Sequence, residues 1–191
     1  MAFSRKVVWW IAAGLLAIGL WLSAAEVSEV DVRREEDRYR LHVAARIDAP
    51  PSTVWKLLTD FHHLERLHHT VRDSTYLGRT AEGMDRVQIH MHPCVMFFCV
   101  DLTQIVEFHS VAARQLLADF DRRESLFNFG HLKWRLDRTT NAGTDLVFDA
   151  ELAPAFWIPP LLGPWILKST LRKTAMDIIM NLDRLSRSGV L

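Results

Sequence analysis

The sequence has no excess of charge of either sign, which argues against a nucleic-acid-binding protein. It has 23 Lys and Arg residues against 23 Asp and Glu residues, so its formal net charge at pH 7 is +0. Proteins that bind nucleic acids usually carry a basic patch or a basic composition. We therefore expect no nucleic-acid partner. The 191 residues contain no internal repeat or low-complexity segment, and they suffice for one domain with an extension.

The motifs of several large enzyme classes are also missing. There is no G-x-S-x-G sequence, no P-loop and no glycine pattern of a dinucleotide-binding fold. Ser, His and Asp residues occur, but their scattered positions indicate no activated nucleophile. The sequence therefore predicts no catalytic residue and no cofactor.

Cysteine is scarce, and its two occurrences are close together. Cys94 and Cys99 are separated by four residues, a spacing that suits a hairpin tip. The sequence leaves a disulfide and two free thiols equally open, because geometry decides whether the bond forms. The four residues between them are apolar: Val95, Met96, Phe97 and Phe98. An apolar tip predicts contact with a membrane surface or a partner, and the alternative is a longer strand buried at the end of the domain.

The N-terminus has the layout of a targeting segment. Arg5 and Lys6 precede an uncharged run, and Ser23-Ala24-Ala25 supplies small residues at a plausible cleavage site. We interpret residues 1–25 as a signal peptide or a retained membrane anchor, since nineteen residues from Val7 to Ala25 carry no charge and a span needs about 20. The positive residues before the run predict export, either to the periplasm or to the outer face of the inner membrane.

A single domain is predicted over residues 39–188, after a charged linker over residues 26–38. The domain opens with a strand in which four apolar residues alternate with others: Leu41, Val43, Ala45 and Ile47. Pro50 and Pro51 end the strand and suit the first turn of a helix. The helix stripe consists of Val54, Leu57, Leu58 and Phe61. The sequence HHLERLHH over residues 62–69 then predicts a second short helix.

The rest of the domain changes from strand to helix periodicity. Alternation predicts strands at residues 71–79, 85–92, 100–109, 116–120, 131–137 and 144–152. After Gly163 and Pro164, apolar residues spaced by three and four predict a long amphipathic helix that ends near Arg187. This order predicts an α+β fold, in which an antiparallel sheet of about six or seven strands packs on the long helix.

Three segments carry a family resemblance. IDAPPSTVWKLLTDF resembles the opening of the START-like helix-grip (SRPBCC) superfamily, also called the polyketide cyclase/dehydrase and lipid-transport superfamily. MHPCVMFFCVDLTQ is similar to the third-to-fourth-strand hairpin of coenzyme Q-binding START-like proteins. FNFGHLKWRL is similar to their F-x-x-L-x-x-x-W-x-F strand, with Leu136 in place of the last Phe. An exported domain with two cysteines departs from the mitochondrial or cytosolic pattern of those proteins.

The resemblance implies an apolar cavity between the sheet and the C-terminal helix. The predicted lining is Val106, Phe108, Leu132, Trp134, Phe148, Ala150, Leu171, Ala175 and Ile178. The same residues could form an ordinary dense core, and only the resemblance favours a cavity. The expected function is binding, and transport or shielding, of a quinone, lipid or polyketide-like molecule. The alternatives are a cyclase/dehydrase that uses the same cavity and a protein-interaction module of the cell envelope. The oligomeric state is left open.

Histidines raise a metal hypothesis that the sequence supports only weakly. His90, His92 and Cys94 alternate on one strand face, but that face is polar and two or three ligands rarely close a site. We interpret it as a solvated face.

Four other histidines follow the first helix, and we interpret them as surface residues because no carboxylate or cysteine completes a ligand motif: His62, His63, His68 and His69. His131 and Asp149 could move protons in a cyclase. Their strand parity places them opposite Trp134 and Phe148, away from the expected cavity.

Overall fold

Strands are the commonest element in the described part of the chain. The computed structural model describes residues 25–95, 98–123, 125, 127–156, 158 and 163–189. The elements are β1 (Glu26–Glu35), β2 (Arg38–Ile47), α1 (Pro51–Leu58), the 3-10 helix η1 (Leu64–Arg66), β3 (Val71–Arg79), β4 (Asp85–Met91), β5 (Cys94–Val95), β6 (Phe98–Cys99), β7 (Leu102–Val111), β8 (Gln115–Phe120), β9 (Phe127–Arg138), β10 (Thr144–Pro154) and α2 (Gly163–Ser188).

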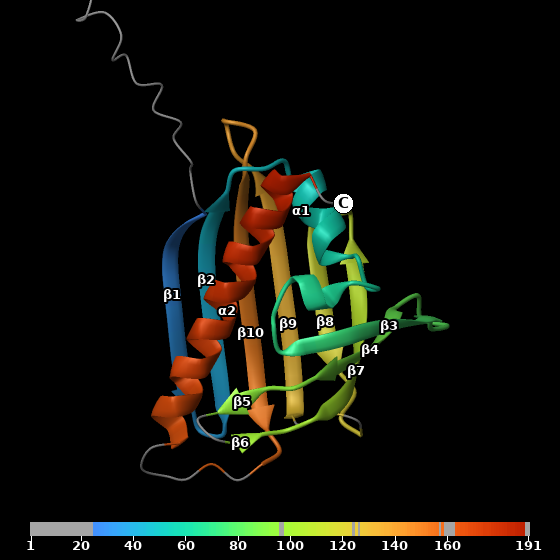
Figure 1. Cartoon of the computed structure of the whole chain (residues 1–191), viewed down its shortest axis with the longest axis vertical. Helices are drawn as coiled ribbons and strands as arrows, with labels where there is room; N and C mark the ends of the chain where they lie inside the picture. The colour runs from blue at the N-terminus through green and yellow to red at the C-terminus, as the bar shows by residue number, and fades with distance from the viewer. Residues whose placement is uncertain are drawn as a thin grey trace, which may run out of the picture.

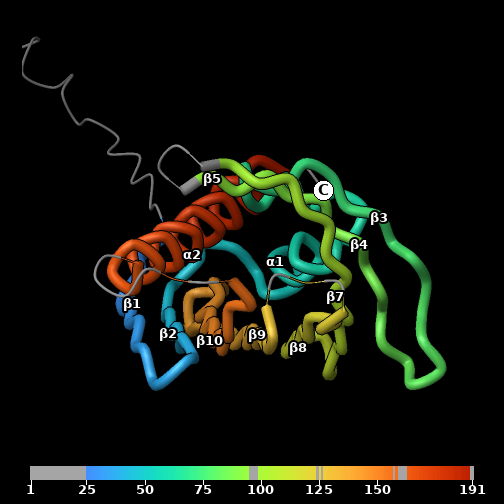
Figure 2. Tube along the Cα trace, turned by 90° about the horizontal axis from the view of Figure 1, so that it is seen from below, coloured from blue at the N-terminus to red at the C-terminus, as the bar shows by residue number. Residues whose placement is uncertain are grey.

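The main sheet has eight strands in the order β1-β2-β10-β9-β8-β7-β4-β3, and a two-stranded ribbon pairs β5 with β6. Every pair of neighbouring strands in the main sheet is antiparallel. The sheet curves, and α1 and α2 lie on its concave face (Figures 1 and 2). This confirms the predicted α+β helix-grip architecture, with more strands than expected.

The additional strand is β1, in a segment for which the sequence predicts a linker. Residues 26–35 pair with β2, and the register shifts between Val27 and Glu29. Three valines of β1 pack against the core: Val27, Val30 and Val32. The register shift changes which face successive residues occupy, so Val27 is out of step in sequence with Val30 and Val32, which are spaced as in a regular strand.

The two ends of the molecule differ. At one end, α1 lies beside the C-terminal half of α2; we call this the α1 end (Figure 1). At the other end lie the β5–β6 ribbon and the first turn of α2, and we call this the hairpin end (Figure 1). The strand β1 starts at the α1 end, because Glu26 pairs with Arg46 near the end of β2.

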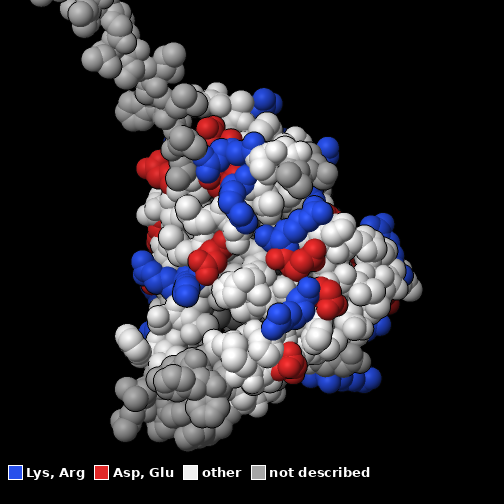
Figure 3. All heavy atoms as spheres, in the orientation of Figure 1, with Lys and Arg blue, Asp and Glu red and all other residues white. Residues whose placement is uncertain are grey.

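Charged side chains of both signs are interspersed over the face that carries α2 (Figure 3). None of the described helices is long and apolar enough to cross a membrane. Most of the predicted targeting segment, residues 1–24, lies outside the described residues.

Candidate functional site

The long helix α2 is attached mainly along one side of the sheet. Its backbone lies close to β1, β2 and α1. The apolar side chains that it buries most completely are Ala175, Ile179 and Leu182, which lie from the middle of the helix toward its C-terminal end. The apolar stripe of α2 therefore packs more tightly at the α1 end than at the hairpin end.

The α1 end is closed by an apolar cap. The stripe of α1 is fully buried, and Val54 has 0% of its surface exposed. Next to it, the ring of Phe61 lies 4.6 Å from that of Phe108 on β7, measured between ring centroids. Pro51 stands in the first turn of α1, where its missing N–H leaves no donor unsatisfied.

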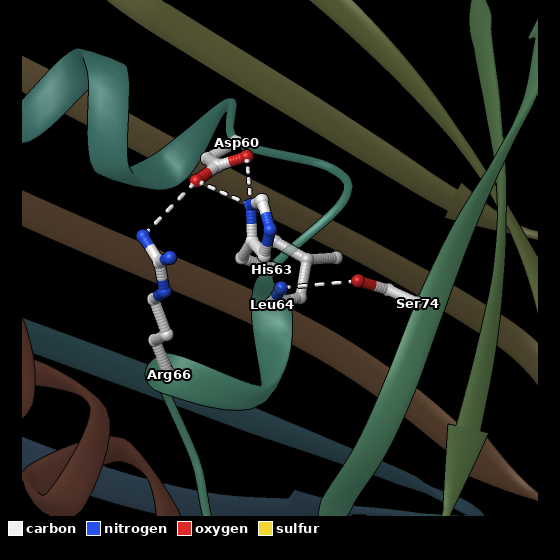
Figure 4. Close-up of polar contacts among 5 residues, drawn as sticks. All are labelled: Asp60, His63, Leu64, Arg66 and Ser74. Carbon is white, nitrogen blue, oxygen red and sulfur yellow. Dashed lines mark hydrogen bonds and ion pairs between the residues drawn. The ribbon is translucent and has the colours of Figure 1, made fainter. Parts of the chain in front are cut away.

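A set of polar contacts fixes the segment that follows α1 (Figure 4). The carboxylate of Asp60 lies 2.9 Å from Nδ1 of His63 and accepts a longer contact of 3.5 Å from Arg66. The backbone N–H of Leu64 donates to Oγ of Ser74 on β3 at 3.0 Å. These contacts hold η1 against β3, so the cap cannot shift independently of the sheet. The 3-10 helix η1 confirms a second short helical element within the segment for which the sequence predicts one.

The predicted cavity residues all lie between the sheet and the helices. Val106, Phe108, Trp134, Phe148, Ala150 and Ala175 are buried members of one apolar cluster, and Leu132 and Ile178 pack against it partly buried. The rings of Trp134 and Phe148, on neighbouring strands, stack with centroids 4.9 Å apart. Leu171 is half-buried on α2.

Packing loosens toward the hairpin end. Met91, Phe120 and Leu132 stay half-buried although they belong to the apolar layer on the concave face. Phe120 lies directly over Gly130: a Cβ built on that glycine would meet the Phe120 ring at 2.0 Å. Glycine at this position therefore lets an aromatic ring lie flat on the sheet, and a side chain there would displace the ring.

Two polar side chains near the hairpin end were not predicted from the sequence. Tyr39, at the start of β2, is 1% exposed, and its hydroxyl has no hydrogen-bond partner among the described residues. Gln104 on β7 is also buried and donates to the sulfur of Met91 at 3.2 Å. A buried hydroxyl without a partner is costly, so Tyr39 marks a place where a bound molecule could accept a hydrogen bond.

A buried carboxylate near β3 is fully engaged by its neighbours. Asp85 accepts a hydrogen bond from the hydroxyl of Tyr76 at 2.9 Å and two from the guanidinium of Arg79 at 3.1 Å. Burial by itself raises the pKa of Asp85, but the hydrogen bonds from Arg79 and Tyr76 outweigh burial and hold that pKa below its usual value. An ionised carboxylate with these partners ties β3 to β4 and is poorly suited to proton transfer.

His131 and Asp149 lie on the convex face, as their parity predicts. His131 lies 2.8 Å from Asp119, and Asp149 lies 2.6 Å from His42, through Nδ1 of each histidine. They border a hollow of about 350 Å³ on the outside of the sheet, whose wall also includes Lys133 and other charged residues. A charged, open hollow does not suit a lipophilic ligand, so the convex face is not the site that the fold favours.

The two cysteines form a disulfide that joins β5 to β6. This answers the question that the sequence left open, and it confirms the predicted hairpin. His92 lies near both sulfurs, but each sulfur is bonded to the other, and His90 instead faces Asp73 at 3.3 Å. Met96 and Phe97 at the tip lie outside the described residues, and so do the side chains of Val95 and Phe98.

One histidine expected at the surface is buried. His62, His63 and His69 are exposed, but His68 is only 4% exposed. Burial lowers the pKa of His68, the nearby His69 and Lys173 lower it further, and Asp177 opposes them. The carboxylate of Asp177 on α2 comes within 3.8 Å of His68 Nε2. The sequence could not reveal this neighbour, because it lies more than a hundred residues further along the chain.

Comparison with known proteins identifies the family. Residues 38–185 match the model of a family described as polyketide cyclase / dehydrase and lipid transport, and the chain belongs to this family. The family and the fold fit a domain with a hydrophobic cavity for lipid or polyketide molecules. No curated protein matches the chain by sequence.

Solved structures share the fold at low sequence identity. The Zhui aromatase/cyclase from Streptomyces sp. R1128 has a TM-score of 0.66 at 14% identity, covering 81% of this chain and 96% of its own. A STAR-related lipid transfer protein from Xanthomonas axonopodis has a TM-score of 0.65 at 14% identity, covering 86% and 99%. A START superfamily protein from Mycobacterium smegmatis has a TM-score of 0.65 at 12% identity, covering 78% and 97%. These similarities establish the fold alone.

Proposed function

We propose that the domain binds a lipophilic small molecule, such as a quinone, a lipid or a polyketide-like compound, and carries or shields it. The binding site is the concave face at the hairpin end. The observation that carries the proposal is a group of apolar side chains toward the hairpin end that the fold covers only in part. Leu182 and Val54 at the α1 end are completely buried, whereas Phe120, Leu132 and Leu171 nearer the hairpin end are half-buried. Apolar surface that the fold itself does not cover is what an apolar ligand would bury.

The polar groups of the concave face favour a binding protein over an enzyme. Asp85 is already bonded to Arg79 and Tyr76, so its carboxylate is not free to exchange protons with a ligand. The Tyr39 hydroxyl is placed to donate one hydrogen bond and thereby orient a carbonyl or quinone oxygen. One oriented donor in an apolar site provides selectivity without chemistry.

The proposal is tested by filling the site with Leu132→Trp. If the hairpin end holds a ligand, tryptophan takes the ligand's place, and the binding of a fluorescent fatty acid or a ubiquinone analogue weakens at least tenfold. The free energy of unfolding of the ligand-free protein then changes by less than about 1 kcal/mol, since overpacking a filled core costs about 1–3 kcal/mol. Titration of the probe and urea unfolding measure the two quantities.

Leu77→Trp is the matched control, because Leu77 is 47% exposed on β3. It should leave probe binding unchanged. The proposal fails if the wild-type protein binds neither probe and releases no apolar molecule on extraction after mild purification from its host. It also fails if Leu132→Trp destabilises the protein as strongly as a filled core predicts.

We further propose that the domain is exported and acts in the periplasm or at the outer face of the inner membrane. The layout of residues 1–25 supports export, and the Cys94–Cys99 disulfide is a bond that oxidising compartments permit. Trp165 in the first turn of α2 is 71% exposed and Val100 beyond β6 is 49% exposed. Apolar side chains exposed at the hairpin end support membrane contact there. Cell fractionation tests export: the full-length protein should leave the cytosol, and recovery of most of it there would contradict export.

A further inference from the structure

A histidine-rich cluster joins the segment between η1 and β3 to the long helix. It consists of His68, His69 and Asp177, whose potential ligand atoms all lie within 4.8 Å of one another. The two imidazole rings are in contact at an interplanar angle of 37°, with centroids 4.4 Å apart. The cluster lies beside the start of β3, where the backbone N–H of His92 donates to the carbonyl of Thr70 at 2.7 Å, and it includes none of the residues named for the proposed lipid site.

The buried histidine of the cluster has one nitrogen engaged and one free. Nδ1 of His68 lies 2.7 Å from the hydroxyl oxygen of Thr70 and accepts a longer contact of 3.3 Å from the backbone N–H of the same residue. Nε2 is buried and has no hydrogen-bond partner among the described residues. Asp177 Oδ2 is 3.8 Å away from it, which is too far for a direct hydrogen bond. A metal ion at Nε2 would require the tautomer in which Nδ1–H donates to the Thr70 hydroxyl, so that the Nε2 lone pair faces Asp177 and the contact from the Thr70 N–H to Nδ1 is given up.

We propose that His68, His69 and Asp177 bind a divalent transition-metal ion, with Zn²⁺ the best fit. Two imidazoles and one carboxylate form a ligand set typical of zinc, and a water molecule would complete the tetrahedron. Thr70 would fix the tautomer of His68, as partners of metal-bound histidines commonly do. Lys173 lies one turn before Asp177 on α2, and its positive charge disfavours a cation bound at this site. Its side chain is exposed, so it can turn toward solvent.

The metal would fasten α2 to the cap of the fold. Asn181, one helical turn after Asp177, already donates to the backbone carbonyl of Leu67 at 3.0 Å. A metal bridge beside this hydrogen bond would add a second link between α2 and the segment before β3. Because α2 covers the concave face, metal binding would restrain the position of this helix relative to the sheet.

The test is a zinc titration of metal-free, full-length protein without a histidine tag, followed by calorimetry. The wild type should bind one equivalent of Zn²⁺ and unfold at a higher temperature when zinc is present. His69→Ala and Asp177→Asn should each weaken binding at least tenfold, since even outer-shell changes at metal sites cost about 10–100-fold. Both residues are partly or fully exposed, so these variants should fold even if His68→Ala does not.

His62→Ala and His92→Ala are the matched controls. His62 is an exposed histidine outside the cluster, and His92 lies beside the disulfide. Both variants should keep the wild-type zinc affinity and the thermal shift. The proposal is overturned if the wild type binds no zinc at 100 µM, a concentration on the order of a hundred times a micromolar dissociation constant. It is also overturned if zinc binding persists in His69→Ala and Asp177→Asn, or is lost only in His92→Ala.

Discussion

Replacing Trp134 with alanine is expected to lower the free energy of unfolding by about 3–5 kcal/mol, the usual cost of truncating a buried aromatic residue. Trp134 is 9% exposed and stacks on Phe148 with ring centroids 4.9 Å apart. The change removes the contact between the two rings and leaves a cavity between β9, β10 and the helical layer. Urea unfolding followed by circular dichroism gives the free energy directly.

A second tryptophan provides the control for this variant. Trp165 is 71% exposed at the start of α2, so Trp165→Ala should change stability by no more than about 0.5 kcal/mol. Equal losses from the two variants would show that Trp134 is not part of a packed layer. In that case the concave face would be open further toward the α1 end than the structure indicates.

Replacing Leu182 with alanine is expected to cost about 2–5 kcal/mol, because a buried leucine is lost where the fold cannot collapse to fill the space. Leu182 is 0% exposed and lies in the second half of α2, the part that approaches α1. For a domain of this size, a loss of 1 kcal/mol lowers the melting temperature by about 2–4 °C. Differential scanning calorimetry should therefore show a clear decrease.

Met180 on the same helix is the control for Leu182. It is 41% exposed, and Met180→Ala should stay within about 0.5 kcal/mol of the wild type. The site proposed for the ligand lies toward the other end of the helix, so a saturating ligand should stabilise Leu182→Ala as much as the wild type. A Leu182→Ala protein as stable as Met180→Ala would contradict the tight seal at the α1 end.

Periodicity predicted most of the fold because strands and helices leave regular apolar patterns in the sequence. β9 and β10 alternate cleanly, and the stripe of α2 repeats at three and four, so both follow from local sequence. β1 was missed because its register shift near Ser28 interrupts the alternation of its valines. The short helical element expected within residues 62–69 is the 3-10 helix η1, and contacts to Ser74 and Asp60 hold this segment.

The site was predictable only in part. Strand parity correctly placed Trp134 and Phe148 inside and His131 outside, because parity is a local property. The pairing of His68 with Asp177 depends on how α2 crosses the cap, and no local pattern contains that information. The free hydroxyl of Tyr39 was equally invisible, since a sequence shows a polar group but not whether it has a partner.

For a domain attached through the segment before Ala25, as proposed above, the direction of β1 would set which end of the domain faces the point of attachment. The strand enters the sheet at the α1 end and spans ten residues, about 33 Å at the usual rise of a strand. A tether that precedes Ala25 would therefore hold the domain by its sealed end and leave the hairpin end pointing away from the point of attachment. Such a domain would be oriented to exchange cargo with a second surface rather than with the membrane that holds it.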